Sequence, residues 1–241
     1  MIPLSINTKK IIFILSVIFF VLFILNLATI IQFKLSGQSR EEFSHFFFNM
    51  FNFEKEKTVP TYFSVVILFL ASQTFLIIRL LIGNTAISSY IKHYWTQMSA
   101  IFILLSMDEV LMLHERLSNF TKTFIPVERT GFFKYSWVVP MIGILLIFGL
   151  YSIKFLMSIP PKLRNGYIIA GSMFVFGAVG LEMLSGKIDT LNMGRDSLLY
   201  LFVMTTEESL EMTGIILLLY FNLNYINELI AETMNSTKKL S

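Results

Sequence analysis

Long apolar runs dominate the sequence, and the segment from Ile11 to Phe33 is the first and most uniform of them. A helix needs about 20 apolar residues to cross the hydrocarbon core of a bilayer, because each residue advances it by only about 1.5 Å. Runs of this length, bounded by polar or turn-forming residues, predict six transmembrane helices at about residues 11–33, 61–83, 96–117, 136–157, 167–184 and 197–222. The predicted fold class is therefore all-α, a polytopic membrane protein with a single integral membrane domain over residues 1–241.

The composition excludes several classes of protein. With 55% hydrophobic residues and 25 Phe among 241 residues, the chain has more apolar side chains than one soluble core of this size accommodates. There is no Cys, so disulfides and thiolate chemistry are excluded, and any catalysis depends on carboxylates, hydroxyls or the three His. The net charge of +3 is spread over loops and termini, which argues against nucleic acid and leaves the lipid bilayer as the expected partner.

Basic residues near the helix ends bear on the orientation. They divide almost equally between the two sides of the predicted bundle, so their number alone does not decide it. Residues such as Lys9, Lys10 and Lys154 lie in short segments that flank the predicted helices directly, and such residues favour the cytoplasmic side. We therefore expect both termini to be cytoplasmic.

The long loop after the first apolar run has a helical pattern of its own. Ser39 followed by Glu42 has the form of a capping box. The apolar residues that then recur at helical spacing are Phe43, Phe46, Phe47, Met50 and Phe51. This pattern predicts a short amphipathic helix that lies in the membrane interface, or one that packs on neighbouring helices or a second subunit.

Acidic residues interrupt the apolar runs. Those inside or at the margin of predicted helices are Asp108, Glu109, Glu182, Glu207, Glu208 and Glu211. Ionisable groups at membrane depth are costly and usually functional. Without a counter-charge, a carboxylate in a medium of low dielectric takes up a proton. Shared protons, a bound cation or a water-filled cavity would each accommodate these groups, so we treat them as candidates for a cation-binding or proton-binding site.

Helical geometry places three of these acids together. At 100° per residue, Glu207, Glu208 and Glu211 fall within an arc of about 100°, so they share one face of the last helix. That face cannot point toward lipid. Asp108 and Glu109 of the third predicted helix are expected near the midplane, opposite it.

A second set of polar residues lies further out. His114 and Glu115 follow Asp108 by one to two helical turns, where the membrane interface can solvate them. Glu182 lies at a depth comparable with that of His114, so either a pair between these two residues or the interface would satisfy them. We treat His114, Glu115 and Glu182 as secondary candidates.

The two acidic segments resemble each other. SMDEVL from Ser106 aligns with TTEESL from Thr205, with hydroxyl, acid and Leu residues at matching positions. This short match is either a coincidence or a sign of a 3+3 inverted repeat, an arrangement in which transporters build sites at the midplane. Both segments also have the capping-box form, which predicts either a break in the helix or a continuous helix whose hydroxyls bond to the preceding turn.

The pattern excludes some metal sites and leaves others open. The spacings of diiron and zinc sites are absent, as are glycine-rich phosphate and dinucleotide motifs. The sequence requires no cofactor. If the carboxylates hold a divalent cation, a carboxylate-rich set with one imidazole suits Mn²⁺, Ca²⁺ or Mg²⁺ better than Zn²⁺.

The combination of S-x-D-E…H-E in residues 106–115 with E-E-x-x-E-M-x-G in residues 207–214 resembles a pattern found in uncharacterised bacterial multi-pass membrane proteins. The resemblance implies that these acids are a family feature and carries no known activity. It is consistent with a location in the bacterial cytoplasmic (inner) membrane.

Three classes of function fit the sequence. In the first, the carboxylates bind or relay a cation or proton in a transporter, channel or coupled subunit. In the second, the protein is a sensor or scaffold in a larger assembly, as a homo-oligomer or with a partner subunit, and the acids form a polar core. In the third, they hold a metal and hydrolyse a lipid-borne substrate, with His114 or a carboxylate as general base. Transport is the expected class, and an enzyme is the less favoured one.

Overall fold

The computed structural model describes residues 5–35, 42–83, 87–114, 116–117, 130–191, 195 and 197–240. All regular structure within these residues is helical, as predicted. The elements are α1 (Thr8–Leu35), α2 (Glu42–Phe51), α3 (Val59–Leu81), α4 (Ser89–Leu111), η1 (Gly131–Phe133), α6 (Val138–Ser158), α7 (Pro161–Val175), η2 (Phe176–Leu181), α8 (Glu182–Thr190) and α9 (Leu198–Leu240).

Within the described residues, five segments are long and apolar enough to cross a membrane. They are Thr8–Leu35, Val59–Leu81, Val138–Ser158, Pro161–Thr190 and Leu198–Asn235. Their length and composition are those of a membrane protein with several spanning helices. The remaining predicted span corresponds to α4, which falls outside this set because its first half carries polar residues such as Lys92, His93 and Gln97.

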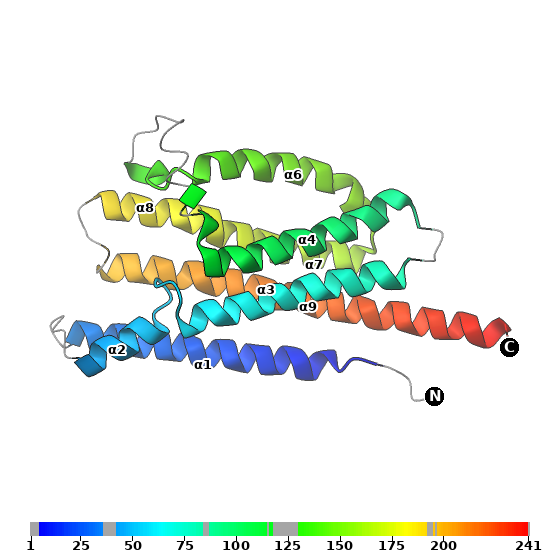
Figure 1. Ribbon diagram of the computed structural model, residues 1–241, viewed down its shortest axis with the longest axis horizontal. Helices are drawn as coiled ribbons and strands as arrows, with labels where there is room; N and C mark the ends of the chain where they lie inside the picture. The colour runs from blue at the N-terminus through cyan, green and yellow to red at the C-terminus, as the bar shows by residue number, and fades with distance from the viewer. Residues whose placement is uncertain are drawn as a thin grey trace.

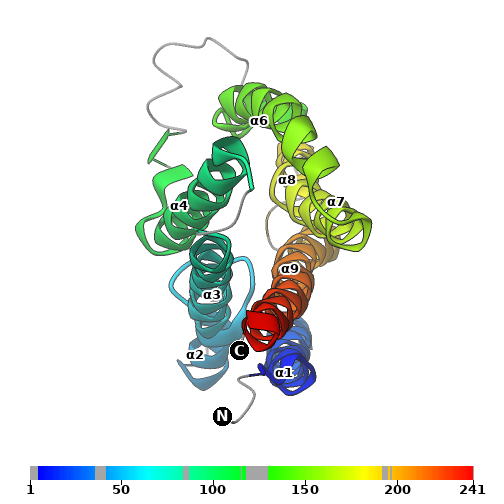
Figure 2. The same ribbon diagram turned by 90° about the vertical axis from the view of Figure 1, so that its right-hand side faces the viewer.

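The helices run side by side along the long axis of the molecule (Figure 1). One end is formed by α2, the end of α4 and the beginnings of α3, α6 and α9, and we call it the α2 end (Figure 1). At the opposite end α1 begins and α9 ends. Viewed along the long axis, α3, α4, α6, α7 with α8, and α9 surround a common centre, while α1 packs outside this ring against α9 (Figure 2).

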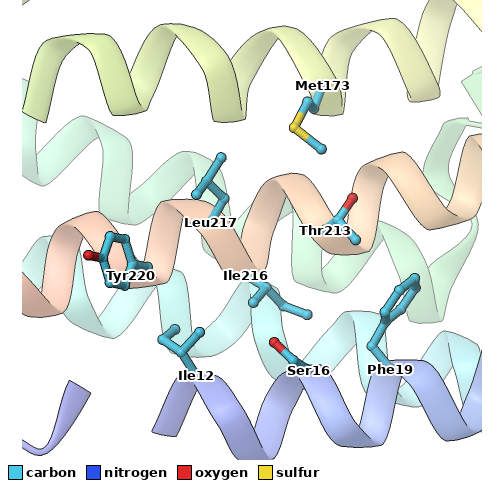
Figure 3. Close-up of a pocket in the computed structure, with 8 residues that line it drawn as sticks. All are labelled: Ile12, Ser16, Phe19, Met173, Thr213, Ile216, Leu217 and Tyr220. Carbon is cyan, nitrogen blue, oxygen red and sulfur yellow. The ribbon is translucent and has the colours of Figure 1, made fainter. Parts of the chain in front are cut away.

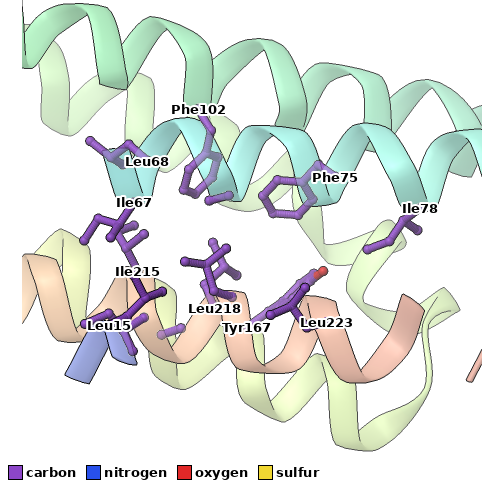
Figure 4. Packing of buried hydrophobic residues seen from close by; sticks show 14 of the residues in the cluster. Leu15, Ile67, Leu68, Phe75, Ile78, Phe102, Tyr167, Ile215, Leu218 and Leu223 are labelled. Atoms are coloured by element: carbon purple, nitrogen blue, oxygen red, sulfur yellow. The ribbon is translucent and has the colours of Figure 1, made fainter. Parts of the chain in front are cut away.

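Aromatic and aliphatic side chains from several helices fill the core (Figure 4). Phe75 of α3 is fully buried, and its ring centroid lies 5.1 Å from that of Phe102 of α4 and 6.0 Å from that of Tyr167 of α7. Tyr94 of α4 stacks on Phe155 of α6 at 3.8 Å. Aromatic pairs of this kind add stability beyond burial alone, and here they join α3, α4, α6 and α7.

Hydrogen bonds between side chains also join the helices. The Tyr167 hydroxyl donates to Asn222 of α9, and the Asn222 amide donates to Thr74 of α3 at 2.8 Å. Ser72 of α3 donates to the Ser99 carbonyl of α4 at 2.8 Å. Each bond satisfies a polar group that would otherwise be costly in an apolar environment.

Several helix boundaries differ from those predicted. The fourth and fifth predicted helices are separated, as expected, near the Pro pair: α6 ends at Ser158 and α7 begins at Pro161. The last helix continues far beyond the predicted end near residue 222, to Leu240. The added turns keep packing, because Ile226 is fully buried and Tyr225 stacks on Trp95 at 5.9 Å.

The third predicted helix is displaced toward the N-terminus. It begins at Ser89 and ends at Leu111, rather than spanning residues 96–117. The next residue, Met112, has φ 51° and ψ 49°, the left-handed conformation that commonly ends a helix. The prediction that His114 lies within this helix was therefore wrong, and His114 follows a backbone turn.

Neither capping-box segment breaks its helix. α4 is continuous through Ser106, whose hydroxyl donates to the Val65 carbonyl of α3 at 3.0 Å. α9 is continuous through Thr205, which accepts a bond from Asn26 of α1 at 3.0 Å. The two hydroxyls therefore have different surroundings, and the inverted repeat stays a prediction.

The amphipathic helix predicted in the first long loop is present as α2. Ser39 of the predicted capping box lies outside the described residues. Phe48 is buried and stacks on Phe33 of α1 at 4.5 Å, whereas Phe46 is exposed. One side of α2 thus packs on a neighbouring helix, which is the second of the two arrangements that the sequence leaves open.

Candidate functional site

Three carboxylates share one face of α9, in the part of the helix near the α2 end. Glu207 is only 3% exposed, and Glu208 and Glu211 are partly buried. The three residues act electrostatically on one another, because Glu211 is influenced by both Glu207 and Glu208. The continuous helix therefore produces the acidic face that the sequence predicts.

A fourth carboxylate comes from the helix that packs beside this face. Glu182 begins α8, directly after the π-helical turn η2. A Cβ added at Gly177 of η2 would lie 2.9 Å from Glu211 Cγ and 3.0 Å from the Glu207 carbonyl oxygen, so only a glycine allows this approach. The Glu182 carboxyl lies close enough to Glu207 for a side-chain hydrogen bond. Single π-helical turns are frequent at functional sites, and this one places Glu182 against α9.

Two further carboxylates reach the same region from other segments. Glu109 of α4 acts electrostatically on both Glu208 and Glu211. Glu56, in the loop between α2 and α3, acts on Glu109 and Glu208. We call Glu56, Glu109, Glu182, Glu207, Glu208 and Glu211 the acidic cluster.

Glu56 is the member that the sequence analysis missed, because it lies in a charged run of a loop. Asn26 of α1 attaches this loop to the bundle, because its Oδ1 accepts a hydrogen bond from the Phe53 amide at 3.0 Å. The Asn26 amide donates to Thr205 of α9 at 3.0 Å, next to the acidic face. The signal that indicates this arrangement is Asn26 itself, a polar residue within a long apolar run.

Charge repulsion dominates the electrostatics of the cluster. Among the described residues, the charged groups that act on Glu207, Glu208 and Glu211 are other carboxylates. Glu207 Oε2 is buried and has no hydrogen-bond partner among the described residues. So many carboxylates cannot all stay ionised in a medium of low dielectric, and they either share protons or bind a cation.

The described residues contain no group of three His, Asp or Glu side chains arranged closely enough to hold a metal ion. The carboxylates interact across the space between helices rather than converging on one point. A divalent cation at the cluster therefore stays a prediction, and its binding would require side chains to move.

Asp108 pairs with His114 beside the cluster, where it also acts electrostatically on Glu109. Asp108 Oδ2 lies 3.0 Å from His114 Nδ1, and Asp108 Oδ1 accepts a bond from the His114 amide at 2.8 Å. Glu182, the partner considered for His114, acts on it electrostatically, and Trp137 contacts both residues. The Trp137 indole donates to Glu182 at 3.4 Å, and its ring centroid is 5.6 Å from that of His114.

The structure therefore brings together some of the predicted site residues and not others. Glu109, Glu182, Glu207, Glu208 and Glu211 are brought together. Asp108 stands one helical turn before the end of α4 and turns toward His114. Glu115 lies outside the described residues.

An open hollow in the described part of the protein lies away from the acidic cluster. It has a volume of about 490 Å³ between α1, α7 and α9, and is lined by Ile12, Ser16, Phe19, Met173, Thr213, Ile216, Leu217 and Tyr220 (Figure 3). Its residues on α9 lie about 180° around the helix from Glu207, Glu208 and Glu211. This mainly apolar groove is separate from the acidic cluster.

The fold and the site are those of an all-helical protein with several helices long and apolar enough to cross a membrane, and with an acidic cluster in which Glu207 is buried and Glu56 is exposed. Residues 13–224 match a family described as a domain of unknown function, DUF8692, and the chain belongs to this family. Both acidic segments, at residues 106–115 and 207–214, fall within the matched range. No curated protein and no solved structure matches the chain.

Proposed function

We propose that the protein binds cations at the acidic cluster, in exchange for protons that the cluster holds when it is empty, as part of a membrane transport system. The observation that carries this proposal is Glu207, a buried carboxyl whose Oε2 has no hydrogen-bond partner in the described part of the chain, while Glu182 and Glu208 act on it electrostatically. A cation in this space would compensate several negative charges at once. Protons can do the same, so the two ligands compete.

The position of the cluster supports access from the α2 end. Glu56 belongs to the loop at this end, and Glu109 lies in the last turn of α4. The opposite part of the bundle is filled by side chains such as Phe75, Trp95 and Tyr167. We infer that ions enter and leave from the α2 end in this conformation, and that release at the other end requires a second conformation.

Further features belong to this proposal. We propose that α4 is the sixth spanning helix, since it runs beside α3 along much of its length (Figure 1). We also propose a bacterial inner membrane location with both termini in the cytoplasm. α1 and α6 expose many apolar side chains at the edge of the bundle, which offers surfaces to lipid, to a second copy or to a partner subunit.

A proton-release measurement tests the binding step. The purified protein in weakly buffered detergent solution is titrated separately with MnCl₂, CaCl₂ and MgCl₂ while the pH is followed. Cation binding should release protons and raise the unfolding free energy by about 2.7 kcal/mol at a concentration about 100-fold above Kd. Glu207→Gln and Glu208→Gln should abolish both effects, and Glu228→Gln, an exposed position of α9, should leave them unchanged.

Infrared spectroscopy tests the proton-bound state independently. Protonated carboxyl groups have a carbonyl stretch that carboxylates lack, and this band should be present at neutral pH and lose intensity when the cation is added. Absence of both the band and any cation effect would overturn the proposal. Flux in liposomes then separates transport from binding, because Glu207→Gln should abolish it while the variant stays folded.

The Asp108–His114 pair favours a second candidate, a metal-dependent hydrolase. A carboxylate bonded to Nδ1 orients an imidazole toward a substrate. Burial lowers the pKa of His114, but the bond to Asp108 raises it by more, to about 9, so at neutral pH the imidazolium would act first as a general acid through Nε2. In that case His114→Gln should abolish hydrolysis of a lipid-borne ester while leaving cation-induced proton release intact. In the transport system, His114→Gln should leave flux largely unchanged.

A further inference from the structure

A second charged region lies at the α2 end, outside the acidic cluster. Asp189 near the end of α8 pairs with two basic residues: its Oδ2 accepts a bond from Arg195 Nε at 3.2 Å and contacts the ammonium of Lys134. One carboxylate thus holds two cations side by side. Lys187 of the same helix makes no ion pair with any described residue, and its ammonium lies 4.5 Å from the Phe132 ring centroid. Three basic residues thus lie near Asp189, while Glu54 and Glu182 act on the neighbouring Tyr200 and Tyr135.

Two phenol groups complete the region. The hydroxyls of Tyr135 and Tyr200 lie 3.4 Å apart, and both act electrostatically on Arg195. Burial raises the pKa of Tyr135, so its hydroxyl stays protonated and can donate a hydrogen bond. Glu182 also lies within electrostatic reach of Tyr135, so this region borders the acidic cluster.

The backbone fixes the region in place. The Gly131 amide donates to Thr190 of α8 at 3.0 Å, which attaches η1 to the end of α8. Gly131 has φ +67°, a conformation that glycine adopts without strain. A Cβ at Gly186 would lie 3.2 Å from Lys134 Cβ, so glycine there lets the segment after η1 approach α8 closely. Lys134 is therefore positioned by packing rather than by its own flexible side chain.

Exposed apolar side chains flank the basic groups. They are Phe132, Phe133, Leu191 and Leu198. Leu191 follows α8 and Leu198 begins α9, so these side chains lie where spanning helices end. Basic and aromatic residues together at the ends of spanning helices are typical of the membrane interface, where phosphate groups and the first part of the acyl chains meet.

We propose that Lys134 and Arg195, with the hydroxyl of Tyr135, bind the phosphate of an anionic membrane lipid, while the buried Tyr200 contacts the Tyr135 hydroxyl from the inside. Arg195 uses Nε toward Asp189 among the described residues, which leaves its two terminal nitrogens for a phosphate, the geometry that guanidinium groups favour. Lys134 adds a point charge, and the flanking apolar side chains contact the acyl chains. This site does not depend on the function proposed for the acidic cluster.

Lipid binding tests the site directly. The full-length protein in a neutral detergent is titrated with fluorescent short-chain phosphatidylglycerol, and anisotropy gives the affinity. Each basic residue near an anionic lipid contributes about fivefold to affinity, so Lys134→Gln with Arg195→Gln should weaken binding about thirtyfold. The matched control is Lys34→Gln with Lys55→Gln, which removes two positive charges at the same end of the bundle and should change affinity less than twofold. Equal losses in the two double variants would overturn the site, because general surface charge would then explain the binding.

Two further measurements test the lipid site even if the Lys134→Gln, Arg195→Gln double variant folds poorly. Asp189→Asn removes the acidic competitor and keeps both cations, so binding should stay equal or become stronger, and a weaker affinity counts against the site. Inorganic phosphate should displace the lipid only at far higher concentration than unlabelled short-chain phosphatidylglycerol. Displacement at the same concentration would show a site for free phosphate and overturn its assignment to lipid.

Discussion

The carboxylate of Asp108 accepts one bond from the backbone amide of His114 at 2.8 Å, and its second oxygen lies 3.0 Å from His114 Nδ1. These two residues lie on either side of Met112, where the backbone becomes left-handed and α4 ends. The pair therefore closes the turn that follows α4. It also turns the Asp108 carboxylate toward His114, although Asp108 still acts electrostatically on its neighbour Glu109.

Replacing Asp108 should loosen this turn. Asp108→Ala removes both interactions and should lower the unfolding free energy by about 1–3 kcal/mol, whereas Asp108→Asn keeps an acceptor for the amide and should cost less. Denaturant unfolding in detergent measures both, with the exposed Glu228→Gln as control. If Asp108→Ala is no less stable than Glu228→Gln, the turn does not depend on this pair.

The left-handed conformation of Met112 predicts an unusual order of stability. At φ 51° a Cβ is strained by about 1–2 kcal/mol, and glycine has no Cβ. Met112→Gly should therefore be more stable than Met112→Ala by about 1 kcal/mol, the reverse of the order in a helix interior. Thermal unfolding of the two variants decides this, and a more stable alanine variant would contradict the backbone conformation.

Gly171 of α7 and Gly177 of η2 provide a matched pair. Gly177→Ala places a methyl group 2.9 Å from Glu211 Cγ and 3.0 Å from the Glu207 carbonyl, so α9 must shift. We expect a loss of about 1–3 kcal/mol and weaker cation binding at the acidic cluster. At Gly171 an added Cβ meets nothing within 4 Å, so Gly171→Ala should be neutral or stabilise by up to about 1 kcal/mol. Equal effects of the two substitutions would contradict the close approach of η2 to α9.

Asn26 holds the loop that carries Glu56. Asn26→Leu keeps a similar size but leaves the buried amide of Phe53 and the hydroxyl of Thr205 without this partner. The expected loss is about 1–3 kcal/mol, with faster hydrogen exchange in residues 52–58. Peptides from α6 serve as the internal reference and should exchange as before. Unchanged exchange in the loop would show that Asn26 does not hold it.

Glu207→Gln tests the cost of the buried acid. An amide cannot ionise, so the substitution removes repulsion from Glu182 and Glu208 and lowers the cost of burial. The variant should gain on the order of 1 kcal/mol in stability while losing the cation effect, which is the signature of a functional residue retained at a cost. Glu228→Gln should change neither quantity, and a Glu207→Gln variant that is less stable would indicate that the carboxyl is structural.

Periodicity and run length were sufficient to predict part of this protein. The apolar runs indicate where helices cross a membrane, because their length must match the bilayer whatever their neighbours are. The angle between residues on a helix is equally local, so the shared face of Glu207, Glu208 and Glu211 follows from their spacing alone. The end of α4 did not follow, because Met112 adopts its conformation together with the bond between Asp108 and His114.

The sequence by itself determined a polytopic helical protein, the existence of α2 and an acidic face on the last helix, since each of these depends on local spacing. Only the tertiary structure decided which acids meet. Glu56 joins the cluster because Asn26 of α1 holds a loop against α9, and Glu182 joins because Gly177 lets η2 approach Glu207. The positions of Glu56 and Glu182 depend on contacts between segments far apart in the chain. The packing of whole helices sets the distances between such segments, and the spacing of residues within one helix does not.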